Sequence, residues 1–193
     1  MSKHIRIGVF IPNGAQFLDV ACVDSLGVMS KEYLSLMPGL PAHVAALAPE
    51  VSIFYISSPT QGTAEIPLTS GATLKATHLH TDSGVAPGKL DVVIVPGPDP
   101  AESFAQDSLD WLKAHAETPD VDVLSICTGL FICASAGIAD GKKASGPRGL
   151  QGMLKKRFPN VKLVGDEFRW VQDGNFWSSG ELWRGVMESV QLC

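Results

Sequence analysis

The chain has 193 residues, of which 45% are hydrophobic and 18% charged, and its formal net charge is -5. This size and composition predict one domain, spanning residues 1–193, with a full hydrophobic core. The charges form no basic stripe of the kind that binds nucleic acid, and no apolar run approaches the roughly 20 residues of a membrane span, so we expect a cytoplasmic protein whose partners are small molecules.

Four short apolar runs rich in β-branched residues predict strands covered on both faces, which is typical of a parallel sheet. They span Ile5–Ile11, Val51–Ser57, Leu90–Gly97 and Val121–Ile126. Between them, Gln16–Val28 and Glu102–Ala116 carry apolar residues at helical spacing. The alternation of strands and helices indicates right-handed βαβ crossovers, so the sequence predicts an α/β fold, a doubly wound sandwich with a mostly parallel sheet.

Three segments interrupt this alternation. Thr63–His80 contains two turn signals, which predict the two short extended arms of an accessory hairpin. Phe168–Ser179 has alternating apolar residues on either side of Asp173-Gly174, the strongest hairpin signal in the chain, so we expect the sheet to end there in antiparallel strands. The long connection Ser30–Pro49 is rich in Pro, Leu and Ala, and we expect it either to cover a pocket or to form a subunit contact.

The cysteines form no CxxC pair and have no histidine at zinc-finger spacing. They are Cys22, Cys127, Cys133 and Cys193. We therefore expect free thiols rather than a disulfide framework, and no metal site. Cys133 lies inside a predicted helix and is interpreted as a core thiol, and Cys22 and Cys193 are given the same interpretation.

Cys127 differs from the others because it lies where a buried strand ends and a helix of small residues begins, in VLSICTGLFICASAG. Ser125, Thr128 and Gly129 leave room for a sharp turn, the outline of a nucleophile elbow with cysteine in place of serine. Such a turn directs the side chain out of the carboxyl edge of the sheet, where open α/β proteins bind ligands. The amino end of a helix lowers the pKa of a thiol beside it, so Cys127 is the predicted nucleophile.

Several motifs, taken together and in this order, resemble the ThiJ/PfpI superfamily of class I glutamine amidotransferase-like proteins. They are FLDV (17–20), VPGPDP (95–100), SICTG (125–129), GLFICASAGIADGKKA (129–144) and DGNFWSSG (173–180). Within the superfamily they are most similar to the isonitrile hydratase branch and its fungal relatives. The resemblance covers nearly the whole chain and implies a flavodoxin-like sandwich that forms homodimers.

Members of this superfamily pair the elbow cysteine with a carboxylate from the first crossover. By position, the resemblance implies that Asp19 is this carboxylate and acts with Cys127, whereas Asp24 has no counterpart and is expected at the surface. The backbone N–H groups of Gly97 and Thr128 would bind an oxyanion or the substrate, because each follows a strand at the carboxyl edge of the sheet. Glycine at position 97 would let a substrate approach the backbone closely.

The chain also departs from the family pattern. Amidase and peptidase members have a histidine after the cysteine, where this chain has Thr128, so peptidase activity is not expected. The segment Ala144–Gly149 and residues 181–193 differ from the corresponding parts of hydratase relatives. The histidines are expected at the surface, two of them at most at the mouth of the pocket, His78 and His80. The others are His4, His43 and His115.

We therefore expect a cofactor-independent enzyme in which the Cys127 thiolate adds to an electrophilic carbon and Asp19 manages the proton. With an isonitrile substrate, the product is an N-substituted formamide. Glyoxalase-like conversion of 2-oxoaldehydes uses the same pair and is the alternative activity. A redox or ligand sensor, in which oxidation of Cys127 alters a partner contact, is the non-enzymatic alternative.

Leu26–Pro49 contains more Leu, Met and Ala than an exposed loop of its length should, and large apolar patches usually mark interfaces. We expect a twofold-symmetric homodimer whose interface helps to wall the pocket. The alternative is that these residues pack on their own sheet.

Overall fold

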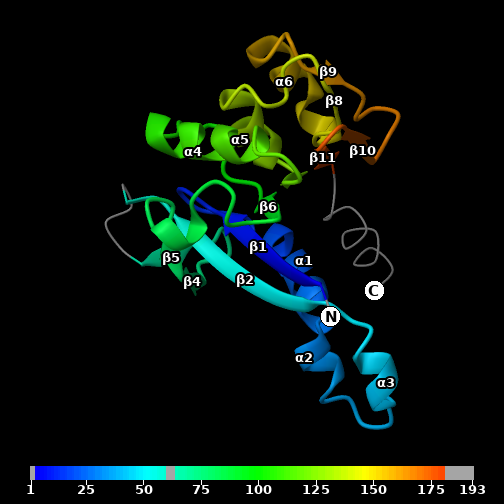
Figure 1. The fold of residues 1–193 in the computed structure, drawn as a ribbon. Helices are drawn as coiled ribbons and strands as arrows, with labels where there is room; N and C mark the ends of the chain where they lie inside the picture. The colour runs from blue at the N-terminus through cyan, green and yellow to red at the C-terminus, as the bar shows by residue number, and fades with distance from the viewer. Residues whose placement is uncertain (1–2, 60–63, 181–193) are drawn as a thin grey trace.

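The computed structural model describes residues 3–59 and 64–180, in which helices cover both faces of a central sheet (Figure 1). The sheet has seven strands in the order β10-β11-β7-β6-β1-β2-β5. Every neighbouring pair is parallel except β10 and β11. The strands are β1 (His4–Phe10), β2 (Glu50–Ser57), β5 (His78–Leu79), β6 (Val92–Val95), β7 (Asp122–Ile126), β10 (Trp170–Asp173) and β11 (Phe176–Ser179). The predicted α/β sandwich with a mostly parallel sheet is confirmed.

Helix α1 (Phe17–Val28) packs on one face of the sheet, and α4 (Gln106–Ala116) and α5 (Gly129–Ser135) pack on the other (Figure 1). Shorter elements connect these parts. They are α2 (Lys31–Leu34), α3 (Ala42–Ala45), α6 (Gln151–Arg157), the 3-10 turns η2 (Ser83–Val85) and η3 (Arg148–Leu150), and the paired strands β3 (Glu65–Pro67) with β4 (Thr73–Lys75) and β8 (Lys143–Ala144) with β9 (Lys162–Leu163). No helix within the described ranges is long and apolar enough to cross a membrane.

The apolar strands fill two hydrophobic layers, one on each face of the sheet. In β6, Val93 and Val95 pack in the layer under α4 and α5, whereas Ile94 packs in the layer under α1. Successive side chains of a strand point to opposite faces, and both faces are covered here, so each position is apolar. This arrangement explains why the central strands appear in the sequence as nearly continuous apolar runs.

Both hairpin predictions are confirmed, since β3 pairs with β4 and β10 with β11 in antiparallel register. The helix predicted over Glu102–Ala116 is wrong at its start, because α4 begins at Gln106. Ala105 has an extended backbone with φ -64° and ψ 143°, and the residues before it are irregular. Glu102 therefore lies in a loop that follows β6 rather than in a helix.

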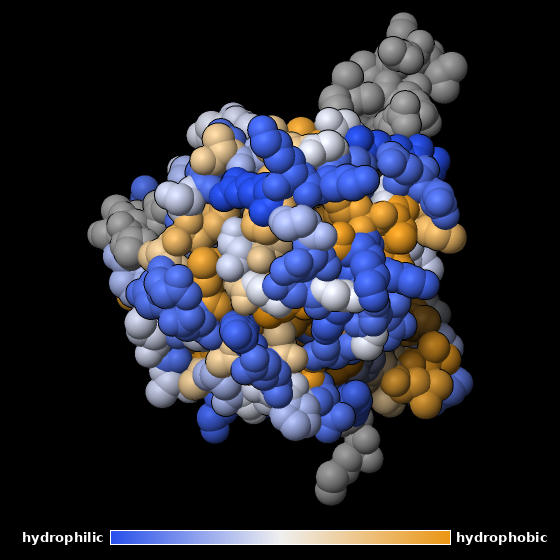
Figure 2. All heavy atoms as spheres, turned by 90° about the horizontal axis from the view of Figure 1, so that it is seen from above, coloured by the Kyte–Doolittle hydropathy of each residue, from blue (hydrophilic) through white to orange (hydrophobic). Residues whose placement is uncertain are grey.

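The long connection Ser30–Pro49 contains α2 and α3, which extend away from the sheet (Figure 1). Its large apolar side chains are mostly exposed: Leu36 is 81% exposed and Leu47 83% exposed. By contrast, the face seen from above in Figure 2 is mainly hydrophilic, with smaller apolar areas between the polar groups. Leu36 and Leu47 therefore do not pack on the sheet, whereas Ala45 is 3% exposed, and the homodimer stays a prediction.

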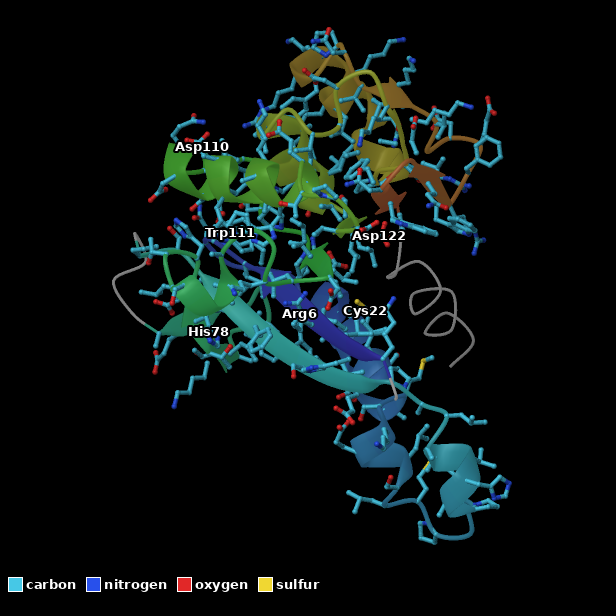
Figure 3. The ribbon with its side chains drawn as sticks, viewed as in Figure 1. Arg6, Cys22, His78, Asp110, Trp111 and Asp122 are labelled. Carbon is cyan, nitrogen blue, oxygen red and sulfur yellow. The ribbon has the colours of Figure 1, made fainter. Side chains whose placement is uncertain are left out.

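The prediction that the histidines lie at the surface is wrong for His80 and His115, which are 5% and 0% exposed. Both pack against Trp111, which projects from α4 in Figure 3, and His80 also meets Phe10. The Val85 carbonyl oxygen lies 3.1 Å from Nε2 of His115 and accepts a hydrogen bond from Trp111 Nε1 at 3.2 Å. Burial lowers the pKa of His115, which keeps its ring neutral inside this aromatic cluster.

Candidate active site

Cys127 occupies a strained turn between β7 and α5. Its φ is 52°, in the left-handed region that cysteine rarely adopts, and its N–H donates to the Ser179 carbonyl at 2.9 Å. The residue is 5% exposed, and α5 begins two residues later at Gly129. This is the strand, turn and helix geometry of a nucleophile elbow.

Glycine at position 129 is required by the closeness of α5 to β6. A Cβ on Gly129 would overlap the Val95 carbonyl oxygen and lie 3.0 Å from the Val95 carbonyl carbon. Any larger residue would push the amino end of α5 away from the sheet and away from Cys127. Gly129 thus keeps the amino end of α5 close to Cys127. The partial positive charge at this end of the helix stabilises a negative charge on the sulfur.

Asp19 lies in the first turn of α1 and is 1% exposed. Its Oδ2 accepts a hydrogen bond from the Gly97 N–H at 3.0 Å, and its carboxyl also forms a side-chain hydrogen bond with Cys127. Burial raises the pKa of Asp19 to about 6, although both hydrogen bonds act in the opposite direction. The carboxyl next to the cysteine therefore gains and loses its proton near neutral pH.

The structure places Gly97 and Thr128 beside this pair. A Cβ on Gly97 would lie 2.5 Å from Asp19 Oδ2 and 3.0 Å from the Thr128 nitrogen, so a side chain at position 97 would collide with the site. Thr128 is 3% exposed, and its hydroxyl donates to the Pro98 carbonyl at 2.7 Å. The Gly97 N–H already holds the Asp19 carboxylate, so its binding to an oxyanion stays a prediction.

The other described thiols differ from Cys127 in their surroundings. Cys22, labelled in Figure 3, lies one turn after Asp19 on α1 and donates to the Asp19 carbonyl at 3.0 Å. Burial and the charge of Asp19 raise the pKa of Cys22 to about 11, and burial raises that of the fully buried Cys133 to about 12. None of the three described cysteines forms a disulfide, and Cys193 lies outside the described residues.

A cavity of about 470 Å³ has Pro98, the residue after Gly97, in its wall. Its wall consists of residues 13–16 after β1, residues 67–69 of the β3–β4 hairpin, and residues 98–100 and 102 after β6. Neither Cys127 nor Asp19 lines the cavity. Gly97 connects the cavity to the pair, because Pro98 follows it, its carbonyl accepts the Gln16 N–H at 2.9 Å, and its N–H donates to Asp19. It lies at the carboxyl edge of the sheet, where parallel α/β folds bind ligands.

The cavity wall contains two acidic residues, Asp99 and Glu102, that were not predicted as site residues from the sequence. Asp99 lies in VPGPDP, at the end of a buried strand, whereas Glu102 was assigned to a helix. Asp24, expected at the surface, is exposed. Within the described ranges, no three His, Cys, Asp or Glu side chains are grouped so that they could hold a metal ion.

Comparison with protein-family models matches residues 34–185 to the DJ-1/PfpI family. The chain belongs to the DJ-1/PfpI family. This confirms the resemblance to the ThiJ/PfpI proteins that the motifs indicated. Two solved structures share the fold: a putative transcriptional regulator protein from Vibrio parahaemolyticus and DJ-1beta from Drosophila melanogaster.

Both structural matches cover almost the whole chain at low identity. The Vibrio protein gives a TM-score of 0.70 at 18% identity, over 97% of this chain and 91% of that one. DJ-1beta gives 0.66 at 18% identity, over 100% and 89%. Among curated proteins, this DJ-1/PfpI chain is 29% identical over 156 residues to isonitrile hydratase from Pseudomonas putida, over 79% of this chain. The match spans 62% of the length of that hydratase.

Proposed function

We propose that this DJ-1/PfpI protein hydrates isonitriles, with Cys127 as nucleophile and Asp19 as the group that moves the proton. The observation that carries the proposal is the hydrogen bond between Cys127 and a buried carboxyl whose pKa is about 6. Such a carboxyl is populated in both protonation states near neutral pH, as general acid–base catalysis requires. The similarity to isonitrile hydratase favours this substrate class.

The reaction begins when the thiol proton of Cys127 passes to Asp19 and the sulfur attacks the terminal carbon of the isonitrile R–N≡C. Asp19 then delivers the proton to that carbon, which gives the thioimidate R–N=CH–S–Cys. Water adds to the same carbon, and the nitrogen takes up a proton. The C–S bond breaks, which releases the formamide R–NH–CHO and restores the thiol. One water is consumed, and nothing is oxidised or reduced.

Groups around Cys127 and Asp19 stabilise each charge that forms during the proposed reaction. The amino end of α5 stabilises the thiolate during attack. The Gly97 N–H stabilises the Asp19 carboxylate after it has given up its proton. The backbone N–H of Thr128 would stabilise charge that develops on the intermediate after water adds. Threonine at position 128 leaves no histidine base next to the nucleophile, so the proposal excludes a peptidase.

The test is incubation of the purified protein with an aryl isonitrile, with formamide measured by chromatography. The wild-type protein should form the formamide, Cys133→Ala should retain this activity, and Cys127→Ala should lose it by a factor of about 1,000 or more. Both substitutions remove one sulfur, so Cys133→Ala controls for the general effect of losing a thiol. Full activity in Cys127→Ala would refute the assignment of the nucleophile.

A parallel incubation with methylglyoxal separates the alternative activity. Conversion of methylglyoxal without hydration of the isonitrile would replace the hydratase by a glyoxalase-like enzyme that uses the same two residues. If neither compound reacts, peptide mass spectrometry after mild peroxide treatment tests the sensor, which requires selective oxidation of Cys127. Each result assigns the pair to a different function.

A further inference from the structure

The cavity that Gly97 connects to the Cys127–Asp19 pair has an acidic wall. Asp99 and Glu102 both contribute to it, and neither forms an ion pair with any residue in the ranges 3–59 and 64–180. The other polar groups of the wall are neutral, namely the amides of Asn13 and Gln16 and the hydroxyl of Thr69. The cavity is therefore lined by negative charges, and no Lys, Arg or His among the described residues forms an ion pair with them.

Glu102 is held in the wall with part of its carboxyl unsatisfied. The Asn13 side chain hydrogen-bonds to this carboxyl and also donates to the Ser103 carbonyl at 3.1 Å. The second carboxyl oxygen, Oε2, is buried and has no hydrogen-bond partner among the described residues. Burial and the nearby charge of Asp99 raise the pKa of Glu102. A buried acceptor without a donor destabilises the protein, and a cation in the cavity would offset that cost.

Asp99 is fixed in position by its own loop. Its Oδ1 accepts a hydrogen bond from the Ala101 N–H at 2.8 Å, and its carbonyl accepts one from the Glu102 N–H at 3.1 Å. These bonds hold the two carboxyl groups in one short turn after β6. A positive group that enters the cavity thus meets two acids whose placement does not depend on the ligand.

Arg157 is a cation that touches this region without neutralising it. Its Nη1 donates to the Pro100 carbonyl at 3.0 Å, and its guanidinium lies over the rings of Phe131 and Phe158 at 5.7 and 5.3 Å from their centroids. It is exposed and is not part of the cavity wall. Its partners are a carbonyl oxygen and two rings, so the acids of the wall remain available to a ligand.

We propose that this cavity binds a positively charged substituent of the substrate and that Glu102 determines this specificity. The inference rests on the proposed function, because it places the isonitrile carbon at Cys127 and the remainder of the substrate in this cavity. The volume of about 470 Å³ lies within the range of small-molecule sites.

The experiment uses two isonitriles that differ only in charge. One carries a trimethylammonioethyl group, and the other is its carbon isostere, in which a tert-butyl group replaces the trimethylammonium. The wild-type protein should prefer the cationic compound by about five- to tenfold in kcat/KM, chiefly through a lower KM. Glu102→Gln should remove most of this preference, because KM should rise more for the cation than for the neutral isostere.

The matched control is Glu117→Gln, which makes the same chemical change at an exposed position on the far end of α4. This variant should keep the wild-type preference. Equal rates for the two isonitriles in the wild-type protein, or a preference that Glu102→Gln does not alter, would overturn the inference and leave the hydratase intact.

A second measurement does not depend on hydratase activity. A trimethylammonioethyl methanethiosulfonate and a neutral alkyl methanethiosulfonate each transfer their thioalkyl group to a thiol, and peptide mass spectrometry gives the rate at Cys127. The cationic reagent should modify Cys127 about five- to tenfold faster relative to the neutral one, and Glu102→Gln should reduce this ratio. If neither isonitrile is hydrated but the ratio behaves in this way, the proposed function fails and the cation site stands. If the ratio is unaffected by Glu102→Gln, the cation site is refuted.

Discussion

Replacing Asp19 by asparagine tests whether this carboxyl has the protonation behaviour that its burial dictates. The residue is 1% exposed, and burial raises its pKa from the ordinary 3.8 to about 6. A raised pKa means that the folded protein holds this proton more tightly than the unfolded chain. The stability that the group contributes is therefore present at low pH and is lost as the pH rises through about 6.

The magnitude follows from the two pKa values. The interval from 3.8 to about 6, at about 1.4 kcal/mol for each pH unit, corresponds to a loss of about 3 kcal/mol of unfolding free energy. An asparagine has no proton to lose there, and its side-chain oxygen still accepts the Gly97 N–H. Asp19→Asn should therefore gain about 2–3 kcal/mol relative to wild type between about pH 4 and about pH 8, and should lose most of its turnover.

Urea unfolding followed by tryptophan fluorescence, repeated across this pH range, measures the difference between the two proteins. All other titrating groups are common to both, so the pH dependence of the difference isolates the buried carboxyl. Asp24→Asn is the matched control, since Asp24 lies exposed on the same helix. Its difference from wild type should stay within about 0.5 kcal/mol. If Asp19→Asn and wild type give parallel curves, the raised pKa and the acid–base role of Asp19 are both refuted.

Three further substitutions test the placement of neighbouring groups. Gly97→Ala would put a Cβ 2.5 Å from Asp19 Oδ2, so kcat/KM for isonitrile hydration should fall about 100-fold, and a wild-type rate would contradict the site. Thr128→Val removes the 2.7 Å hydrogen bond to the Pro98 carbonyl and should lower the urea unfolding free energy by about 1–3 kcal/mol, whereas an unchanged value would show that this bond contributes nothing. Leu36, which is 81% exposed in the long connection, should lie in the dimer interface, so light scattering should detect a wild-type dimer and a Leu36→Glu monomer. If light scattering shows that the wild-type protein is a monomer, the predicted dimer is refuted.

Much of the fold is predictable because local patterns in the chain are strong. Strands buried on both faces require nearly continuous β-branched runs, and Ile5–Ile11 and Val121–Ile126 have them. The turn at Asp173-Gly174 is equally local, since Gly174 adopts a φ of 65° that glycine tolerates. The elbow at Cys127 could be inferred for the same reason, because the small residues that permit it are its neighbours.

Sequence reasoning was wrong where burial depends on distant residues. His80 was expected at the surface, but it packs against Phe10 of β1 and Trp111 of α4, which lie far from it in the chain. His115 is buried against Trp111 of its own helix and against the Val85 carbonyl, 30 residues away. The apolar spacing over Glu102–Ala116 predicted a longer helix than the one observed. That spacing carries no information on where the chain leaves β6, and the loop there keeps Glu102 out of α4 and in the cavity wall.

The sequence by itself determined the order of strands and helices, the sharp turn at Cys127 and, through its resemblance to a family, the carboxylate that would accompany the cysteine. Only the tertiary structure decided that Asp19 and Gly97, 78 residues apart, share a hydrogen bond, and that the carboxyl is buried enough to raise its pKa to about 6. Secondary structure follows from periodicities that a short segment contains within itself. The charge state of a side chain follows from its solvent exposure and its neighbours, which exist only once β1, β6 and β7 lie side by side in the sheet.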